Sequence, residues 1–185
     1  MSTYVILGGA GTTGRRIAER LTGRGHRAVL ASRSGERSFD WTDESTWPAA
    51  LAGAGGLYAA YSPDLAAPGA IDIVGALAQR AAAAGVERAV LLSGRGEEAA
   101  AEAEQAFLAG LPGAAVVRCA WFDQNFTEGV FAAAVAAGTF SLPAPGTATE
   151  PFLDADDIAD CVVALLTGPT APTGVHELTG PALVS

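Results

Sequence analysis

The 185-residue chain contains no lysine, so all 11 of its basic residues are arginines. Together with 20 acidic residues they give a formal net charge of −9 at pH 7. A surface that binds nucleic acid needs clustered cations to neutralise the phosphates. An acidic chain without a basic stripe therefore argues against DNA or RNA as a partner.

Metal-ligating residues are also scarce: the cysteines are Cys119 and Cys161, and the histidines are His26 and His176. These residues lack the paired spacing of a disulfide framework or a zinc site, and the cysteines are expected in the core. The aspartates within 154–157 are explained by helix capping and by the helix dipole. We therefore expect no bound metal.

Long apolar runs are absent as well. Half of the residues are hydrophobic (50%), yet no apolar run reaches the roughly 18 residues of a membrane-spanning helix. The first residues also lack the basic and apolar segments of a secretory signal. These absences predict a cytoplasmic protein without a membrane partner.

The strongest motif in the chain is a glycine turn near its beginning. Apolar residues 5–7 lead into Gly8-x-x-Gly11-x-x-Gly14, and residues 15–21 continue with the apolar spacing of a helix. A strand, a tight glycine turn and a helix N-terminus in this order are typical of a site for a dinucleotide pyrophosphate. The predicted cofactor contacts in the turn are Gly8, Gly11, Thr12, Thr13 and Gly14.

The end of the second expected strand, over 27–31, predicts which dinucleotide binds. In such folds a carboxylate at this point takes the ribose hydroxyls of NAD, whereas an arginine accommodates the extra phosphate of NADP. Ser32 and Arg33 stand here, and no carboxylate occurs before Glu36. Because Arg33 offers a planar fork to a phosphate, we expect NADP(H); the alternative is that Arg33 is an exposed loop residue.

The next segment supplies two more candidate cofactor contacts. A short strand over 37–41 and a helix over 43–51, capped by Thr42, are expected here. In this topology Asp40 and Trp41 lie beside the adenine pocket. Trp41 fits a core aromatic position equally well.

Strand and helix patterns alternate along the whole chain. Strands are expected over 5–7, 27–31, 37–41, 55–61, 87–92, 114–119, 151–153 and 175–179. Helices are expected over 15–23, 43–51, 69–84, 97–108, 128–137 and 154–165. This alternation predicts an α/β fold with a doubly wound parallel sheet in three layers. We expect one domain over 1–185, with 138–185 contributing to a substrate lobe and the loop 138–150 covering a pocket.

Three polar residues follow expected strands and are the candidate catalytic residues. Ligands of an open parallel sheet lie beyond the carboxyl ends of its strands. Tyr61 and Ser93 are predicted at the cofactor rim and near the reacting atoms, with Tyr61 as a hydrogen-bond partner. Asp123 is predicted in an electrostatic or proton-relay role. Alternatively, Asp123 caps the following helix and Ser93 bonds a loop amide.

These segments together resemble the NmrA-like group of atypical short-chain dehydrogenases/reductases. The resemblance is narrower to bacterial relatives of the ergot-alkaloid reductases, the agroclavine and festuclavine dehydrogenase-like proteins. The matching segments are 8–14, 31–37, 39–41, 91–98, 120–129, 151–160 and 177–181. The resemblance implies a Rossmann-type fold, NADP(H) binding through the glycine turn and Arg33, and a small organic substrate. Because members usually continue past the last of these segments into further helices, we expect a substrate lobe that is cut short.

The absence of lysine limits the chemistry that the resemblance implies. Standard members of the superfamily use a Tyr-x-x-x-Lys pair, in which the lysine lowers the pKa of the tyrosine, and this chain has no such pair. An iminium, enone or quinone is then an easier hydride acceptor than an ordinary ketone. We expect an NADPH-dependent reductase of such a substrate; the alternative is a non-catalytic NADP(H)-binding redox sensor or regulatory interaction protein. The alanine-rich helix faces would suit either a homodimer or packing on the sheet.

Overall fold

The computed structural model describes residues 2–129, 131–141, 146–171 and 173–185. In this part of the chain seven strands form one sheet in the order β3-β2-β1-β4-β5-β6-β7, and each strand is parallel to its neighbours. The strands are β1 (Thr3–Leu7), β2 (Arg27–Ser32), β3 (Arg37–Ser38), β4 (Gly56–Ala59), β5 (Arg88–Gly94), β6 (Ala114–Cys119) and β7 (Gly174–Leu178). The predicted doubly wound parallel sheet is confirmed.

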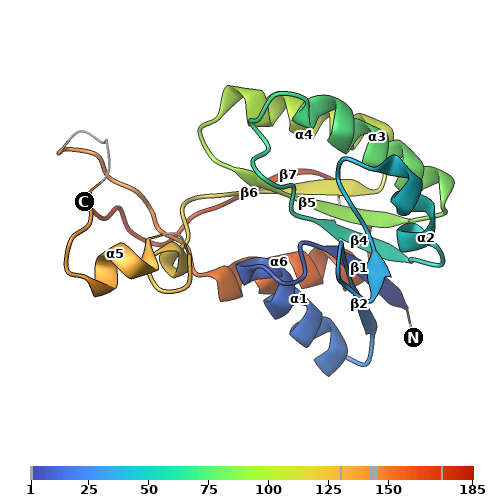
Figure 1. Cartoon of the computed structure of the whole chain (residues 1–185), viewed down its shortest axis with the longest axis horizontal. Helices are drawn as coiled ribbons and strands as arrows, with labels where there is room; N and C mark the ends of the chain where they lie inside the picture. The colour runs from blue at the N-terminus through green and yellow to red at the C-terminus, as the bar shows by residue number, and fades with distance from the viewer. Residues whose placement is uncertain (1, 130, 142–145, 172) are drawn as a thin grey trace.

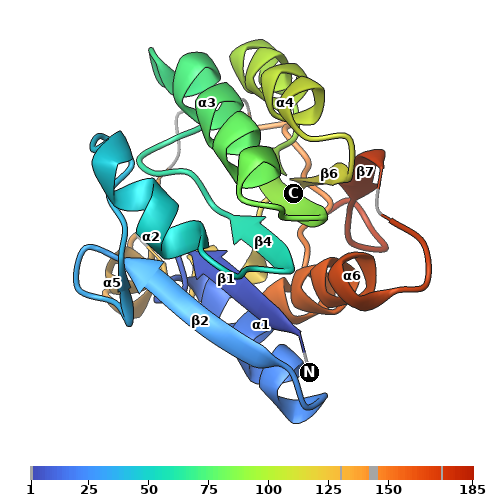
Figure 2. The same ribbon diagram turned by 90° about the vertical axis from the view of Figure 1, so that its right-hand side faces the viewer.

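Helices cover both faces of the sheet, which makes three layers (Figures 1 and 2). One face carries α1 (Thr12–Gly23) and α6 (Ala155–Thr167), and the other carries α2 (Trp47–Leu51), α3 (Ala70–Ala83) and α4 (Glu98–Gly110). Each face has its own apolar core. Because both faces are covered, the central strands are apolar along nearly their whole length, as in other parallel sheets.

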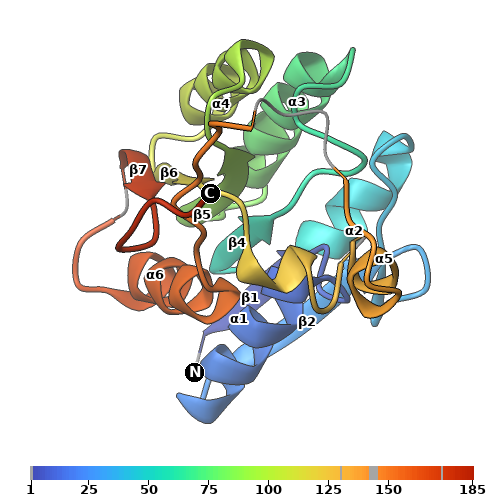
Figure 3. The ribbon, with the colours of Figure 1, turned by 90° about the vertical axis from the view of Figure 1, so that its left-hand side faces the viewer.

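The direction of the winding reverses at β1. The chain goes from β1 outward to β2 and β3, then returns to β4 on the other side of β1 and continues outward to β7. Ligands of such sheets lie outside the carboxyl ends of the strands at this reversal. The described part of segment 121–153, which carries α5 (Ala132–Ala136), lies beyond the carboxyl end of β6 (Figures 1 and 3).

The third strand is shorter than predicted, since β3 contains only Arg37–Ser38. The backbone then turns, and Asp40 forms an isolated antiparallel bridge with Asp43. Asp43, and not Thr42 as predicted, caps the next turn, because its carboxylate accepts the Ser45 N–H at 3.0 Å. Thr42 instead donates to the Asp40 carboxylate through its backbone N–H and its hydroxyl.

Three further elements also differ from prediction. Segment 43–51 forms the 3-10 helix η1 (Glu44–Thr46) and then α2, because Pro48 has no backbone N–H and suits only the first turn of a new helix. Where a helix over 128–137 was expected, the described residues form only the short α5, and the 3-10 helix η2 (Asp123–Asn125) precedes it. The strand predicted over 151–153 is only an isolated bridge between Phe122 and Leu153.

Two expectations from the sequence concern membranes and a covering loop. Within the described residues, no helix has both the length and the apolarity needed to cross a bilayer. Of the loop expected over 138–150, residues 142–145 lie outside the described part of the chain. Its covering of a pocket stays a prediction.

Candidate functional site

The glycine turn after β1 has almost no room for side chains. Gly8 has a φ of +82°, a left-handed conformation that favours glycine, and its carbonyl accepts the Gly11 N–H at 2.9 Å. A Cβ at Gly14 would lie 2.4 Å from the Gly8 carbonyl oxygen and 2.7 Å from the Gly9 Cα. The third glycine of the motif therefore lets α1 begin directly against the turn.

The start of α1 offers backbone donors to an anion. Gly11 stands before the helix in an extended conformation, no side chain in the described residues caps it, and its first turn has no acidic residue. The first N–H groups of Thr12, Thr13 and Gly14 are free of helical partners, and the helix dipole adds a positive end. The Thr13 side chain points away from this end, because its hydroxyl lies 2.7 Å from the Tyr58 hydroxyl in the core.

A cavity of about 320 Å³ opens beyond the ends of β1 and β2, and we call it the β2 pocket. Its lining includes five predicted cofactor contacts: Gly8, Ser32, Arg33, Asp40 and Trp41. The sequence therefore identified residues from three separate segments that the fold brings to one cavity.

The charged residues of the β2 pocket are Arg33 and Asp40. The Asp40 carboxylate accepts from the Thr42 backbone N–H at 2.9 Å and from the Thr42 hydroxyl at 2.8 Å. These two hydrogen bonds, the backbone one foremost, lower the pKa of Asp40, and the Arg33 charge lowers it further. The carboxylate is thus held in its charged form beside an exposed guanidinium.

Aromatic side chains form the boundary between the β2 pocket and its neighbour. Trp41 is half-buried and meets Tyr61 edge-on, with ring centroids 4.9 Å apart. It meets Phe39 of the core in the same way, also at 4.9 Å. Trp41 thus packs against the core and also lines a cavity, and its place beside an adenine stays a prediction. Ala60 lines both pockets.

The second cavity, of about 240 Å³, lies beyond the ends of β4, β5 and β6, and we call it the β5 pocket. Tyr61 and Ser93 both line it, so the fold brings together two of the three catalytic candidates. Asp123 is exposed and is not among the lining residues. The neighbouring Asn125 lines the pocket instead, because η2 begins at Asp123 and turns the chain there.

Behind Ser93 lies a buried ion pair that the sequence analysis missed. Ser93 is 5% exposed, and its hydroxyl lies 2.5 Å from Oε1 of Glu104, which is completely buried on α4. Arg118 of β6 donates to both carboxylate oxygens of Glu104, with 3.0 Å from Nε to Oε1. An arginine within the otherwise apolar strand 114–119 was the signal that a carboxylate had to lie opposite it.

Arg95 is a further pocket residue that the sequence analysis missed. It lines the β5 pocket, as Arg33 lines the β2 pocket. Within the described residues these two arginine side chains have no hydrogen bond or ion pair, whereas the others have at least one. The two cavities therefore each contain one guanidinium that is available to an anion.

One wall of the β5 pocket continues into a cluster of aromatic rings. Trp121 lines the pocket and stacks on Phe131, with centroids 5.8 Å apart and planes 10° apart. Phe126, Phe140 and Phe152 extend the cluster through edge-on contacts. A planar apolar ligand would find π surfaces on this side of the cavity.

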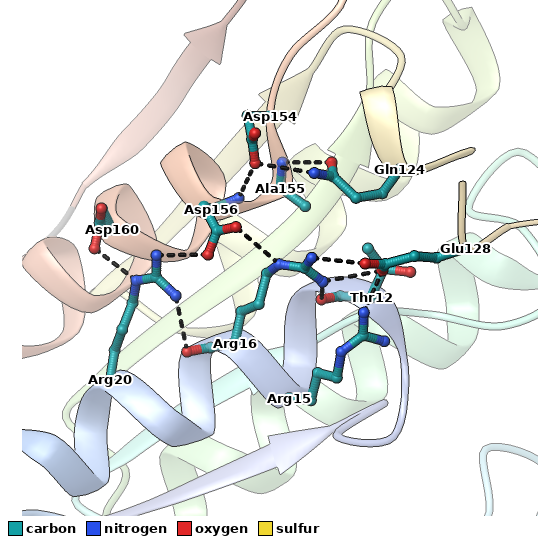
Figure 4. A network of polar contacts seen from close by, with 10 residues as sticks. All are labelled: Thr12, Arg15, Arg16, Arg20, Gln124, Glu128, Asp154, Ala155, Asp156 and Asp160. Atoms are coloured by element: carbon teal, nitrogen blue, oxygen red, sulfur yellow. Dashed lines mark hydrogen bonds and ion pairs between the residues drawn. The ribbon is translucent and has the colours of Figure 1, made fainter. Parts of the chain in front are cut away.

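A network of ion pairs joins α1 to the segment beside the β5 pocket (Figure 4). Glu128 binds both Arg15 and Arg16, with 2.8 Å between Nη2 of Arg16 and Oε1 of Glu128. Asp156 of α6 binds Arg16 at 3.2 Å and Arg20 at 2.7 Å. The arginines next to the glycine turn thus connect the start of α1 to the segment after β6 and to α6.

This network predicts an acid-sensitive contribution to stability. Hydrogen bonds from Arg16, foremost, and from Arg15 lower the pKa of Glu128 from 4.5 to about 2. A carboxylate with a lowered pKa stabilises the fold above its ordinary pKa, and that contribution disappears as the pH falls through the lowered value. Glu128→Gln should therefore reduce the melting temperature at about pH 6 but have little effect at about pH 2. Glu102→Gln, at an exposed residue of α4, is the control, and an equal loss at both pH values would contradict the role of Glu128.

The geometry of the described residues supports neither a cysteine nucleophile nor a metal centre at this site. Burial raises the pKa of the Cys119 thiol to about 12, so this pocket-lining cysteine stays protonated and is a poor nucleophile. Among the described residues, no three side chains of the histidine, cysteine, aspartate or glutamate type gather as metal ligands would.

Comparisons with curated proteins give relatives that align along nearly the whole chain. No family model matches it. It is 29% identical over 201 residues to festuclavine synthase I of Penicillium roqueforti, an alignment that covers 99% of this chain and 70% of the relative. It is 30% identical over 200 residues to agroclavine dehydrogenase of Claviceps fusiformis, with 99% of this chain and 69% of the relative covered.

Solved structures of the same fold include dinucleotide complexes. MoeE5 in complex with UDP-glucuronic acid and NAD superposes with a TM-score of 0.79 at 14% identity, over 99% of this chain and 78% of that one. Triphenylmethane reductase of Citrobacter sp., complexed with NADP(H), superposes with a TM-score of 0.74 at 14% identity, over 99% of this chain and 72% of that one. At these identities the likeness establishes the fold alone.

Proposed function

The chain belongs to the family of the festuclavine synthases and agroclavine dehydrogenases, oxidoreductases of the atypical short-chain dehydrogenase/reductase type, and from that premise we propose that it is an NADPH-dependent reductase. The proposed substrate is a small organic iminium, enone or quinone. The observation that carries the proposal is the pair of adjoining cavities, which share Ala60 at the carboxyl ends of the strands. One has the features of a nucleotide pocket, and the other has polar groups with an aromatic wall.

The residues present fit a dinucleotide. The uncapped start of α1 offers N–H groups to a pyrophosphate, and the space that a Cβ at Gly14 would fill is taken by the turn itself. In this proposal Ser32 and Arg33 bind the extra phosphate of NADP(H), while Asp40 and Trp41 lie along the adenosine. Tyr61 and Ser93 lie at the nicotinamide end. When bound, the cofactor supplies a hydride.

The tyrosines support an acceptor that needs no strong acid. Tyr4 and Tyr58 are buried, and their hydroxyls bond to Leu166 and Thr13 in the core. Burial, foremost, raises the pKa of Tyr58 further above its ordinary value. Tyr61 is thus the tyrosine that lines the β5 pocket. In an iminium the carbon accepts the hydride and its electron pair, the nitrogen becomes a neutral amine, and no proton has to be transferred. Tyr61 then binds and orients the substrate.

Turnover of NADPH with defined acceptors tests this function. We expect oxidation of NADPH, followed by its absorbance, with an iminium such as a 3,4-dihydroisoquinolinium, an enone or a quinone. The amine or reduced product should form in a 1:1 ratio to NADP⁺. Binding of NADPH with no turnover of any acceptor class would instead support the sensor function. Absence of NADPH binding would contradict both.

Arg33→Ala tests the choice of cofactor. Loss of a charge-assisted contact to the extra phosphate should weaken NADPH binding by about tenfold or more, while NADH binding changes little. Titration calorimetry with both cofactors measures the difference. Arg27→Ala is the matched control, because Arg27 is an exposed arginine at the opposite end of β2 that pairs with Glu36. Equal losses of NADPH and NADH in Arg33→Ala would contradict a phosphate contact.

A further inference from the structure

Three polar side chains lie in one row across the sheet below α4. Ser93 of β5 is the register partner of Arg118 of β6, which in turn is the register partner of Glu177 of β7. Neighbours in register of a parallel sheet point to the same face. Glu104 reaches this row from α4, so that the four side chains form a line from the β5 pocket toward the sheet edge.

The geometry of this row makes the Glu104 side chain a hydrogen-bond acceptor. The Glu104 side chain is completely buried, and Arg118 donates to both of its oxygens in a side-on pair. The hydrogen bond to Glu104, foremost, raises the pKa of Arg118, so the guanidinium is charged. A carboxylate that accepts two N–H groups of one guanidinium in this side-on geometry acts as a hydrogen-bond acceptor through both of its oxygens.

The direction of the hydrogen bond at Ser93 follows from this geometry. Since both Glu104 oxygens accept from Arg118, the Ser93 hydroxyl donates across the 2.5 Å to Oε1. A serine hydroxyl has one proton, and this bond uses it. The remaining lone pairs of Oγ are what Ser93 presents to the β5 pocket.

We propose that Glu104 is a positioning residue that makes Ser93 a hydrogen-bond acceptor toward the β5 pocket, so that the site prefers ligand groups with an N–H or O–H donor. The inference rests on the proposed function in one respect, namely that the substrate enters this pocket. A carbonyl oxygen receives no proton from Ser93, whereas a protonated amine or an N–H iminium gains a bond. Within the proposed acceptor classes, the inference therefore names N–H iminium ions as the preferred substrates.

Glu104→Gln lets the Ser93 hydroxyl donate toward the β5 pocket where it accepts in the wild type, with little change in the shape of residue 104. In the variant the amide oxygen at the Oε2 position accepts from Nη2 of Arg118, and the NH₂ at the Oε1 position donates to Ser93 at the cost of the hydrogen bond from Nε of Arg118. The Ser93 proton is then free to turn toward the pocket. Two probes of the same outline report this change: 1,2,3,4-tetrahydroisoquinolinium, a donor, and isochroman, which has an ether oxygen in place of the NH₂⁺ group. Their affinities are measured on protein saturated with NADP⁺.

We expect the affinity ratio of the donor probe to the acceptor probe to fall by about fivefold or more in Glu104→Gln. Glu177→Gln is the matched control, because Glu177 binds the same arginine at 2.9 Å without touching Ser93, and its ratio should not change. In a Ser93→Ala background, Glu104→Gln should change the probe affinity ratio by no more than about twofold, because the Ser93 hydroxyl that responds to residue 104 is absent.

Several results would overturn the inference. An unchanged ratio in Glu104→Gln is one, and a full-sized change in the Ser93→Ala background is another, because it would mean a general charge effect. If Glu104→Gln does not fold, Ser93→Ala alone tests the inference. It should lower the affinity for tetrahydroisoquinolinium and leave the affinity for isochroman unchanged. Wild-type protein that binds NADP⁺ but neither probe also contradicts the inference. NADPH binding and iminium turnover, measured on the same samples, show separately whether the proposed function holds.

Discussion

Gly14→Ala is expected to lower NADPH affinity by about 100-fold and the free energy of unfolding by about 2–3 kcal/mol. The added Cβ would lie 2.4 Å from the Gly8 carbonyl oxygen and 2.7 Å from the Gly9 Cα. Both contacts are to backbone, which cannot rotate away as a flexible side chain would. The start of α1 must therefore move off the turn, and the N–H groups proposed to bind the pyrophosphate move with it.

The same helix contains the control for this substitution. Gly23 is the last residue of α1, and a Cβ there would meet nothing within 4 Å. Gly23→Ala should leave NADPH binding unchanged and change stability by no more than about 1 kcal/mol, in the stabilising direction. Calorimetric titration and urea unfolding measure the two quantities. A Gly14→Ala protein that binds NADPH as the wild type does would mean that the turn does not bind the pyrophosphate.

Arg118→Met is expected to lower the free energy of unfolding by about 3 kcal/mol or more. The substitution keeps much of the side-chain volume but leaves the Glu104 carboxylate, which is completely buried, with only Ser93 as a partner. A buried charge that loses its ion-pair partner retains the cost of its desolvation. Thermal and urea unfolding at about pH 7 measure the loss.

Two variants separate this effect from a general loss of packing. Glu177→Gln removes the other, half-exposed carboxylate of Arg118 and should cost less than about 1 kcal/mol. The double variant Glu104→Leu with Arg118→Met removes both buried charges and should recover most of the stability lost in Arg118→Met. If the double variant is as unstable as the single one, the cost comes from altered packing and not from an unpaired charge.

The sequence predicted much of the lining of the β2 pocket because several local signals agreed there. Apolar residues, three spaced glycines and a helical pattern follow one another within 5–21, and each needs only its neighbours to be interpreted. Placing Arg33 and Trp41 near the glycine turn needed one further rule, that ligands lie beyond the strand ends. Both residues line the same cavity as Gly8.

The other half of the site depended on contacts that no local pattern encodes. Glu104 and Arg118 meet because β5 and β6 pair in a particular register and α4 lies above them. From sequence, Glu104 was one of several glutamates in an acidic, alanine-rich helix. Asp123, the candidate from the segment after β6, does not line the pocket, whereas Asn125 does, because η2 turns the chain from Asp123 onward and no local pattern predicts that turn.

The pairing of α1 with α6 also affects the order in which the chain can fold. Ile17 and Leu21 of α1 share an apolar core with Ile158 and Val162 of α6, which are more than a hundred positions later in the sequence. Contacts between such distant positions form late, because a long loop must close first. During synthesis, the part of α1 that packs on α6 therefore stays uncovered until α6 has been made, while Ile6 of β1 can already pack against the rest of its apolar side. We expect β1, α1 and β2 to gain their full protection from hydrogen exchange only in chains that include α6.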